Sequence, residues 1–225
     1  MKILHISDTH GFHEQLKIPE DVDMIIHTGD ATNWKDPYRN SNEMLDFIHW
    51  YQDVPCFNKI YICGNHDTSM ERGLIKRSAF EAADIIYIEN ELVEIDGVKI
   101  WGSPYTPTFC DWAFMKSRNT INRVWETIPN NVDVIATHGP CKGILDLSYN
   151  HHNELEFCGD SALRKHVLEI QPKLFLSGHI HNCQDILNVG TRTVEGYRTI
   201  FSNAACVTDG RFDKGLTSHG NILEI

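Results

Sequence analysis

The sequence lacks the run of about 20 apolar residues that a helix needs to cross a bilayer, and it lacks any C-x-x-C pair. Its first residues, MKILHISDTHG, turn polar too early for the apolar region of a secretory signal. The seven cysteines are an odd number without paired spacing. They fit free thiols in a reducing compartment better than a disulfide framework or a zinc knuckle. We therefore expect a cytoplasmic protein with no membrane attachment.

Positive charge is also scarce. The chain has 20 basic residues against 31 acidic ones, a formal net charge of −11. Such a charge disfavours broad electrostatic binding to duplex DNA or to an anionic membrane. It does not exclude a small phosphate substrate, because bound metal ions can supply local positive charge. The length of 225 residues allows a sizeable core, and we expect one domain over residues 1–225.

Short apolar segments alternate along the chain with segments of helical spacing, and there is no repeat or low-complexity segment. The predicted strands are residues 3–6, 24–28, 59–63, 132–136 and 174–176. The predicted helices are residues 42–52, 75–83, 112–127 and 161–170, the last with Asp160 as its N-cap. Residues 91–103 predict a hairpin that turns at Asp96-Gly97, and residues 197–225 predict further strands. This order predicts an α/β sandwich of mixed sheets.

Each of the five predicted strands ends in a glycine-containing turn that carries aspartate, asparagine or histidine. One such turn is weak evidence, but five are hard to explain by turn chemistry, which has no preference for histidine. In open α/β sheets, sites assemble at the carboxyl ends of the strands. The residues at these ends are Asp8, His10, Asp30, Asn65, His66, His138, His179 and His181.

The mixture of oxygen and imidazole nitrogen at these strand ends indicates a metal site. It suits Mn, Fe or Zn better than an all-oxygen calcium site or a thiolate site. Seven candidate ligands, without His66, are too many for one ion. Two ions that share a bridging carboxylate would use all seven, at the roughly 3.5–4 Å separation of two-metal hydrolases.

The five strand ends together resemble the signature of a known family, the calcineurin-like metallophosphoesterases. The matching blocks are Asp8-x-His10, Gly29-Asp30, Gly64-Asn65-His66-Asp67, His138-Gly139 and Gly178-His179-x-His181, all in the family's order. A weaker similarity, to a small branch of single-domain metallophosphodiesterases, involves His138-Gly-Pro140, Cys158-Gly-Asp160, Gly178-His-Ile-His181 and Ser202-Asn-Ala204.

The resemblance implies a four-layer α-β-β-α sandwich, in which two mixed sheets lie between helices. It also implies a division of the metal ligands. Asp8, His10 and His181 would bind one ion. Asn65, His138 and His179 would bind the other, with Asp30 bridging the two. We expect two divalent ions, Mn²⁺ before Fe or Zn²⁺, since ligand type alone does not separate these metals.

These residues suggest a mechanism for phosphoester hydrolysis. Hydroxide held between the metals would attack phosphorus in line, and His66 would act as the acid or charge-stabilising group near the leaving oxygen. Asp67 would orient the His66 ring or keep it protonated, as carboxylate partners of catalytic histidines do. The alternative is that Asp67 caps the following segment and His66 only packs.

Three functions are compatible with these residues. The branch resemblance and compact size favour a phosphodiesterase acting on a small or cyclic nucleotide-like diester. A phosphomonoesterase or a nuclease could use the same metal centre, although we expect no duplex nucleic acid as a partner. A non-catalytic scaffold would have lost ligands or His66, and this chain retains them. Protein phosphatases carry Asp-Arg-Gly after their Gly-Asp, whereas this chain reads Ala31-Thr-Asn-Trp34. The oligomeric state stays open.

Other polar and aromatic residues are expected to support or surround the site. His5 and His27 are expected to be hydrogen-bonded histidines of the core. Residues 143–160 are expected to form a loop over the site, in which His151 and His152 are solvated. Residues 105–114 are rich in aromatics and would either form a wall of the substrate pocket or pack between the sheets.

Overall fold

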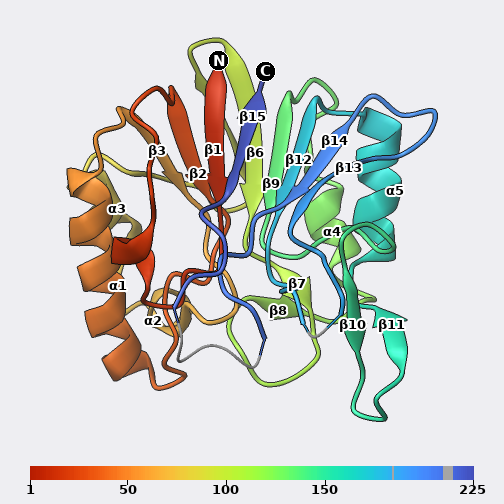
Figure 1. Ribbon diagram of the computed structural model, residues 1–225, viewed down its shortest axis with the longest axis horizontal. Helices are drawn as coiled ribbons and strands as arrows, with labels where there is room; N and C mark the ends of the chain where they lie inside the picture. The colour runs from red at the N-terminus through yellow and green to blue at the C-terminus, as the bar shows by residue number, and fades with distance from the viewer. Residues whose placement is uncertain (184, 210–214) are drawn as a thin grey trace.

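Two mixed β-sheets pack face to face between helices in the computed structural model, which describes residues 1–183, 185–209 and 215–225 (Figure 1). Sheet 1 has the order β15-β1-β2-β3-β4. Its strands are β15 (Asn221–Glu224), β1 (Lys2–Ile6), β2 (Met24–His27), β3 (Asn58–Tyr61) and β4 (Ile86–Tyr87). All neighbours are parallel except β15, which is antiparallel to β1.

Sheet 2 has the order β13-β14-β12-β9-β6-β5. Its strands are β13 (Gly190–Thr193), β14 (Ile200–Asn203), β12 (Leu174–Ser177), β9 (Val134–Thr137), β6 (Val98–Ser103) and β5 (Glu91–Ile95). The four central strands are parallel, and both edge strands are antiparallel to their neighbours. The predicted hairpin of residues 91–103 is therefore confirmed as β5 and β6.

Three separate apolar cores show that the molecule has four layers. The core between the sheets includes Ile26 of sheet 1 and Ile100 and Leu176 of sheet 2. A second core lies between sheet 1 and the helices α1 (Pro37–Asp53) and α3 (Arg77–Glu81), and a third between sheet 2 and the helices α4 (Asn122–Trp125) and α5 (Ser161–Ile170). Figure 1 shows the two helix pairs on opposite sides of the sheets. The expected four-layer α-β-β-α sandwich is confirmed.

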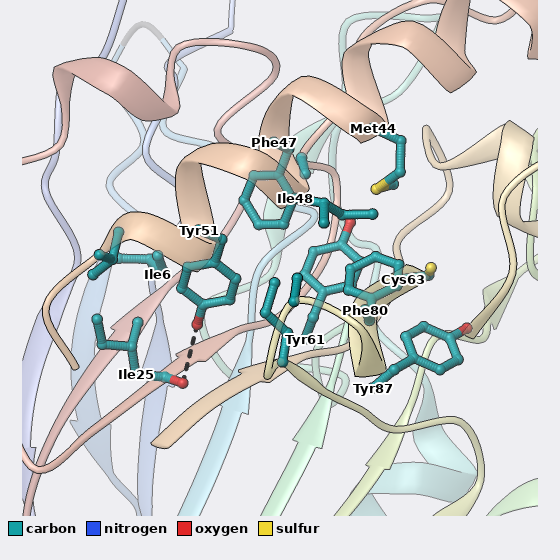
Figure 2. Close-up of a cluster of buried hydrophobic side chains, with 14 of the residues drawn as sticks. Ile6, Ile25, Met44, Phe47, Ile48, Tyr51, Tyr61, Cys63, Phe80 and Tyr87 are labelled. Carbon is teal, nitrogen blue, oxygen red and sulfur yellow. Dashed lines mark hydrogen bonds between the residues drawn. The ribbon is translucent and has the colours of Figure 1, made fainter. Parts of the chain in front are cut away.

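Helix α1 illustrates how local sequence and packing agree. It begins at Pro37, whose ring suits the first helical turn, after Asp36 accepts a cap bond from the Arg39 amide. Its buried face places Phe47 and Tyr51 on sheet 1 (Figure 2). The Tyr51 hydroxyl is buried and donates to the Ile25 carbonyl at 3.1 Å, so the sheet satisfies the one polar atom of that ring.

Most predicted elements are present with shifted ends. The helix predicted over residues 42–52 starts at Pro37, and the one predicted over 161–170 is confirmed as α5, with Asp160 accepting the cap bond from the Leu163 amide at 2.7 Å. The helix predicted over residues 112–127 is wrong. Only Asn122–Trp125 is helical there, because the preceding residues form β8 and turns that carry aromatic side chains into packing.

Short elements gather at the end of the molecule where the parallel strands finish, at the bottom of Figure 1. They are α2 (Thr68–Glu71), the pair β7 (Thr106–Pro107) and β8 (Met115–Lys116), and the hairpin β10 (Leu147–Tyr149) and β11 (Leu155–Phe157). The predicted loop of residues 143–160 therefore contains a hairpin. The short helix η1 (His13–Gln15) contacts α1. No helix in the described part of the chain is both long enough and apolar enough to cross a bilayer.

Candidate metal centre

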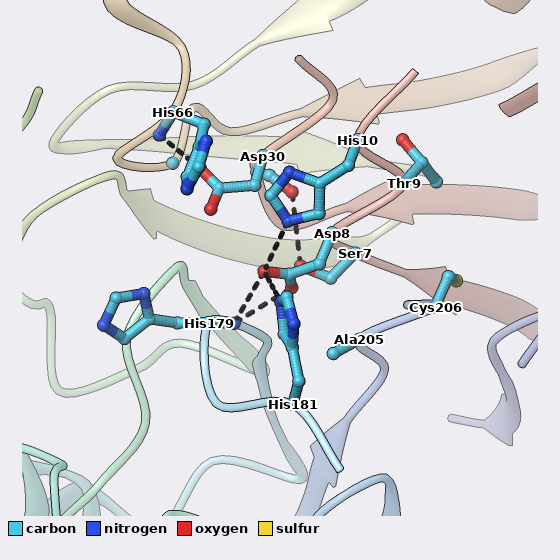
Figure 3. Close-up of polar contacts among 12 residues, drawn as sticks. Ser7, Asp8, Thr9, His10, Asp30, His66, His179, His181, Ala205 and Cys206 are labelled. Atoms are coloured by element: carbon cyan, nitrogen blue, oxygen red, sulfur yellow. Dashed lines mark hydrogen bonds and ion pairs between the residues drawn. The ribbon is translucent and has the colours of Figure 1, made fainter. Parts of the chain in front are cut away.

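The turns after five strands meet at the carboxyl edges of the two sheets. Those after β1, β2 and β3 come from sheet 1, and those after β9 and β12 come from sheet 2. They bring together all eight strand-end residues that the sequence singled out: Asp8, His10, Asp30, Asn65, His66, His138, His179 and His181. Figure 3 shows Asp8 facing His10, His179 and His181.

The backbone at this edge is strained at four of these residues. Asp8, His10, Asp30 and His179 have positive φ angles of 51°, 44°, 57° and 68°. Residues with side chains rarely adopt this left-handed region, and each such residue costs of order 1–3 kcal/mol. Contacts in the rest of the fold compensate for this cost. The left-handed backbone conformation turns these side chains toward one another where each strand ends.

Two glycines of the motifs allow the turns to approach closely. A Cβ on Gly178 would collide with Asp8 Oδ2 and the Ser7 hydroxyl, and a Cβ on Gly64 would come within 2.6 Å of a ring carbon of His138. Only glycine fits where backbone must lie against these side chains. The glycines are thus part of how the site is built.

One group of candidate ligands consists of Asp8, His10 and His181, which offer ligand atoms within 4.8 Å of one another. Asp8 Oδ1 lies 3.0 Å from His181 Nε2 and 3.9 Å from His10 Nε2. The His179 amide donates to Asp8 Oδ2 at 2.9 Å. The carboxylate therefore faces nitrogens from both sheets.

A second group consists of Asp30, His138 and His179. His138 Nε2 lies 3.3 Å from Asp30 Oδ2 and 2.9 Å from Asn65 Oδ1. Asp30 also offers a ligand atom close to His10 and His66, so it lies between the two groups. The residues assemble in the groups that the family resemblance implies, and their binding of metal remains a prediction.

The outer nitrogens of three histidines are held by oxygen acceptors. Nδ1 of His10 donates to the Thr32 carbonyl at 3.1 Å, and Nδ1 of His138 donates to the Thr28 carbonyl at 2.8 Å. Nδ1 of His181 lies 3.0 Å from Oδ1 of Asp209. A carbonyl can only accept, so the proton of a neutral ring stays on Nδ1 and Nε2 is left for a metal.

Asp209 is the residue of this site that sequence reasoning missed. It follows β14 in the chain but lies in none of the recognised motifs, and no spacing rule links it to His181. Its carboxylate beside the ring is the arrangement often found around metal-binding histidines.

Burial and charge oppose each other at the titratable groups of the site. Burial lowers the pKa of His10 and of His179 to about 3. Burial acts in the same direction on His138, but the charge of Asp30 outweighs it and raises the pKa to about 9. For His181, Asp209 and Asp8 together outweigh burial and raise the pKa to about 10. The buried carboxylates thus attract positive charge.

The donor set fits divalent metal ions. Two buried carboxylates, an amide oxygen and four imidazoles converge, which is a set that Mn, Fe or Zn accepts. His179 Nδ1 is buried without a hydrogen-bond partner among the described residues. A buried ring nitrogen without a partner is costly unless something else binds it.

Asp67 holds the turns of the site together. Its Oδ2 accepts hydrogen bonds from the Gly64 amide at 2.6 Å, the Asp30 amide at 3.0 Å and the Tyr61 hydroxyl at 2.7 Å, and its Oδ1 accepts from the Thr32 hydroxyl at 2.9 Å. This replaces the predicted contact with the catalytic ring, because both carboxylate oxygens are turned toward backbone and buried hydroxyl groups. It also differs from the alternative of a cap, since Asp67 makes no side-chain cap bond to α2.

His66 has other partners. Its Nδ1 donates to the Asn33 carbonyl at 3.2 Å. Its ring stacks on Trp112, with centroids 4.1 Å apart, and meets the His10 ring edge-on at 4.7 Å. The half-buried ring therefore lies between the candidate ligands and an aromatic wall.

A cavity of about 360 Å³ opens above these residues. One wall is formed by Pro107, Phe109 and Trp112, so this part of residues 105–114 takes the first of the two predicted positions. Phe114 is buried in the core near sheet 1 instead. Another part of the lining comes from the β10–β11 hairpin, which contributes Tyr149 and Glu156. His151 and His152 are exposed in the turn of that hairpin and do not line the cavity.

The two strand histidines are confirmed as residues of the core. His5 is buried and its ring nitrogens lie 2.8 Å from the Ser202 hydroxyl and 3.0 Å from the Thr28 hydroxyl. His27 Nε2 lies 3.1 Å from the Thr9 hydroxyl. Both rings thus support the turns that carry the site.

Two mixed sheets between helices, with histidine and aspartate clusters at their carboxyl edge, define a metallophosphoesterase-like protein. Residues 1–183 match the model of the calcineurin-like phosphoesterases. The chain therefore belongs to the calcineurin-like phosphoesterase family, which confirms the resemblance found in its sequence. The family implies a dinuclear metal centre, and the chain is a metallophosphoesterase with candidate metal-binding clusters.

Individual relatives agree with this family. The chain is 30% identical over 212 residues to metallophosphoesterase domain-containing protein 1 of Homo sapiens, across 84% of this chain and 63% of that protein. It is 33% identical over 193 residues to probable rhamnogalacturonate lyase C of Emericella nidulans, across 80% of this chain and 17% of that protein. Because the chain spans less than two thirds of either relative, the activities of those whole proteins are not carried over.

A solved structure supports the fold. The phosphopantetheinyl hydrolase PptH from Mycobacterium tuberculosis has a TM-score of 0.57 to this chain at 13% identity, and the match covers 99% of this chain and 95% of that chain. At this identity the similarity concerns the fold alone.

Proposed function

We propose that this chain is a metal-dependent phosphodiesterase that hydrolyses a small or cyclic nucleotide-like phosphodiester. The observation that carries the proposal is the pair of ligand groups around Asp30, from each of which residues line one cavity. A scaffold protein has no need for two buried carboxylates and four buried or half-buried histidines that face one another.

The ligand groups would hold two divalent ions, for which we propose Mn²⁺ with Fe or Zn²⁺ as alternatives. Asp8, His10 and His181 would hold one ion, Asn65, His138 and His179 the other, and Asp30 would be shared. When bound, two such ions supply hydroxide at neutral pH and stabilise negative charge on phosphoryl oxygens.

His66 would complete the site on the side of the leaving group. Its ring lines the cavity above Asp30, and one of its nitrogens faces the Asn33 carbonyl. The other nitrogen is available to donate a proton to the oxygen of the departing ester. A positioned acid of this kind contributes about 10²–10⁴ in rate.

The charge of the cavity supports a diester over a monoester. Beyond the candidate metal ligands, Glu156 and Asp209 line it, and Arg118 is its one cation among the described residues. A diester carries a single negative charge, so it meets less repulsion from these carboxylates than a dianionic monoester. Its second ester group would contact Phe109 and Trp112. The net charge of −11 supports a small substrate and no duplex nucleic acid.

A comparison of two substrates tests the proposal. The protein is stripped with chelator and restored with Mn²⁺, and its hydrolysis of bis-p-nitrophenyl phosphate is compared with that of p-nitrophenyl phosphate. We expect metal-dependent hydrolysis with preference for the diester, after which cyclic nucleotides, dinucleotides and short oligonucleotides identify the natural class. Preference for the monoester would indicate a phosphomonoesterase. No hydrolysis of either, with metals shown to be bound, would indicate a scaffold.

We also propose that the protein works in the cytoplasm. All seven cysteines are free, and five of them are buried. Free thiols in this number are typical of proteins in a reducing compartment.

A further inference from the structure

We propose that Glu43 on α1 is a positioning residue for His66. It fixes the direction of the Asn33 carbonyl, and that carbonyl decides which ring nitrogen of His66 faces the cavity. The kinetic part of the test below rests on the proposed phosphodiesterase function. The spectroscopic part does not.

Stacking fixes the plane of the His66 ring but not its orientation within that plane. Trp112 lies against one face at 4.1 Å between centroids, with 28° between the planes, and His10 meets the ring edge-on at 4.7 Å. A half-turn of the ring about its bond to Cβ exchanges nitrogen and carbon positions and leaves a stack almost unchanged. Another contact must therefore select the nitrogen that reaches the cavity.

The Asn33 carbonyl provides that contact. It lies 3.2 Å from His66 Nδ1, and since a carbonyl only accepts, Nδ1 must carry a proton and donate it. A flipped ring would place a carbon against this oxygen and lose the bond. Nε2 is then left as the nitrogen that faces the cavity. In the doubly protonated ring, Nε2 carries the second proton and could give it to a leaving oxygen, while Nδ1–H keeps its bond to the carbonyl.

The Asn33 carbonyl belongs to an exposed segment, so its direction must be fixed by another contact. Glu43 Oε2 accepts the amide of Asn33 at 2.8 Å and the amide of Trp34 at 2.9 Å. The Trp34 amide and the Asn33 carbonyl are two ends of one planar peptide group, and in a trans peptide they point in opposite directions. By holding the amide end from α1, Glu43 aims the carbonyl end toward His66.

A second residue of α1 supports the same arrangement. Asn40, one turn before Glu43, is fully buried, and its amide nitrogen donates to the Trp34 and His66 carbonyls at 2.8 Å each. It ties the two segments together, but its loss would disturb folding. Glu43 is only half-buried, which makes it the better residue to substitute.

The spectroscopic test measures ¹⁵N chemical shifts of the His66 ring in the full-length protein loaded with diamagnetic Zn²⁺. The signals are assigned by their loss in His66→Gln. We expect the Nδ1–H form in the wild-type protein and a mixture of ring forms in Glu43→Ala. The control Glu169→Ala removes an exposed glutamate from α5, on the opposite side of the molecule, and is expected to match wild type. A wild-type ring without Nδ1–H, or an unchanged ring in Glu43→Ala, would overturn the proposal.

The kinetic test compares two phosphodiesters that differ in the leaving group. A p-nitrophenolate leaves without help from an acid, whereas an alkoxide needs a proton. In Glu43→Ala we expect kcat for the alkyl ester to fall about tenfold and kcat for the nitrophenyl ester to change by less than about twofold. KM should stay constant, and Glu43→Gln, which keeps one acceptor oxygen, should recover much of the loss.

His66→Ala separates this inference from the proposed function. It should show the same dependence on the leaving group to a larger degree. If it shows none while the ring form still changes in Glu43→Ala, the acid role of His66 fails and the positioning by Glu43 stands. An equal loss on both esters in Glu43→Ala would show general damage to the site and overturn the positioning role.

Discussion

The main-chain N–H of His179 donates to Oδ2 of Asp8 at 2.9 Å, although 171 positions separate the two residues in the sequence. Asp8 follows β1 of sheet 1 and His179 follows β12 of sheet 2. The bond therefore joins the carboxyl edges of both sheets at the centre of the candidate metal site. The geometry of the ligands therefore depends on how the two sheets pack against each other, in addition to the structure of each sheet.

The two histidines of the Gly178-His-Ile-His181 motif should serve different ions. His179 belongs to the group with His138, and His181 belongs to the group with Asp8. We expect His179→Ala and His181→Ala each to lower metal content from about two ions per chain to about one, at different positions. Metal analysis combined with anomalous diffraction of both variants checks this. Loss of the same ion in both would contradict it.

Metal binding should release protons. Burial disfavours charge on His138 and His181, but the neighbouring carboxylates outweigh it and raise their pKa values to about 9 and about 10. Both rings are therefore protonated at pH 7 in the metal-free protein, and a metal must displace these protons. We expect about two protons released per chain at pH 7. The affinity should weaken as pH falls below about 10 and more steeply below about 9. Calorimetry in two buffers of different ionisation enthalpy measures this, and zero release would contradict the assignment.

The sequence predicted the arrangement of the fold because the five central strands are continuous apolar segments followed by glycine turns. It failed over residues 112–127, where apolar spacing suggested one helix. There Trp112 and Phe114 pack at the cavity wall and in the core near sheet 1, while Ile121 and Trp125 pack against sheet 2. Tertiary packing overrode local periodicity, since both patterns place apolar residues at similar intervals.

Asp67→Asn tests whether Asp67 holds the turns or assists catalysis. An asparagine would present these three donors, from Gly64, Asp30 and Tyr61, either with its own N–H₂ group or with a neutral carbonyl oxygen in place of the charged carboxylate. We expect a loss of about 3 kcal/mol in the free energy of unfolding, measured in urea, and an activity loss that is equal for good and poor leaving groups. If stability is unchanged and activity is lost only on esters with poor leaving groups, Asp67 assists catalysis instead.

Two helix caps of different burial should differ in their contribution to stability. Asp160 accepts the Leu163 amide at 2.7 Å and the Trp125 indole at 3.0 Å and is buried. Asp36 accepts a cap bond from the Arg39 amide at an exposed position. We expect Asp160→Ala to cost about 3 kcal/mol and Asp36→Ala about 1 kcal/mol in thermal or urea unfolding. Equal costs would show that the indole bond contributes little.

The site was predictable where a side chain sits at a strand end, and unpredictable where a contact crosses between loops. Asp8, Asp30 and His138 all follow apolar strands directly, so the sequence placed them at one edge. The contact of Asp209 with His181, and that of Glu43 with the Asn33–Trp34 peptide, join segments that no local pattern relates. Such partners depend on how loops fold back over the sheets, which periodicity does not encode.

A dinuclear centre at this site requires that two ions share Asp30. Diffraction from crystals of the protein soaked with Mn²⁺, recorded at the manganese absorption edge, locates the ions. We expect two anomalous peaks roughly 3.5–4 Å apart, with Asp30 contacting both, Asp8 beside one and His138 beside the other. A single peak, or two peaks without a shared Asp30, would contradict it.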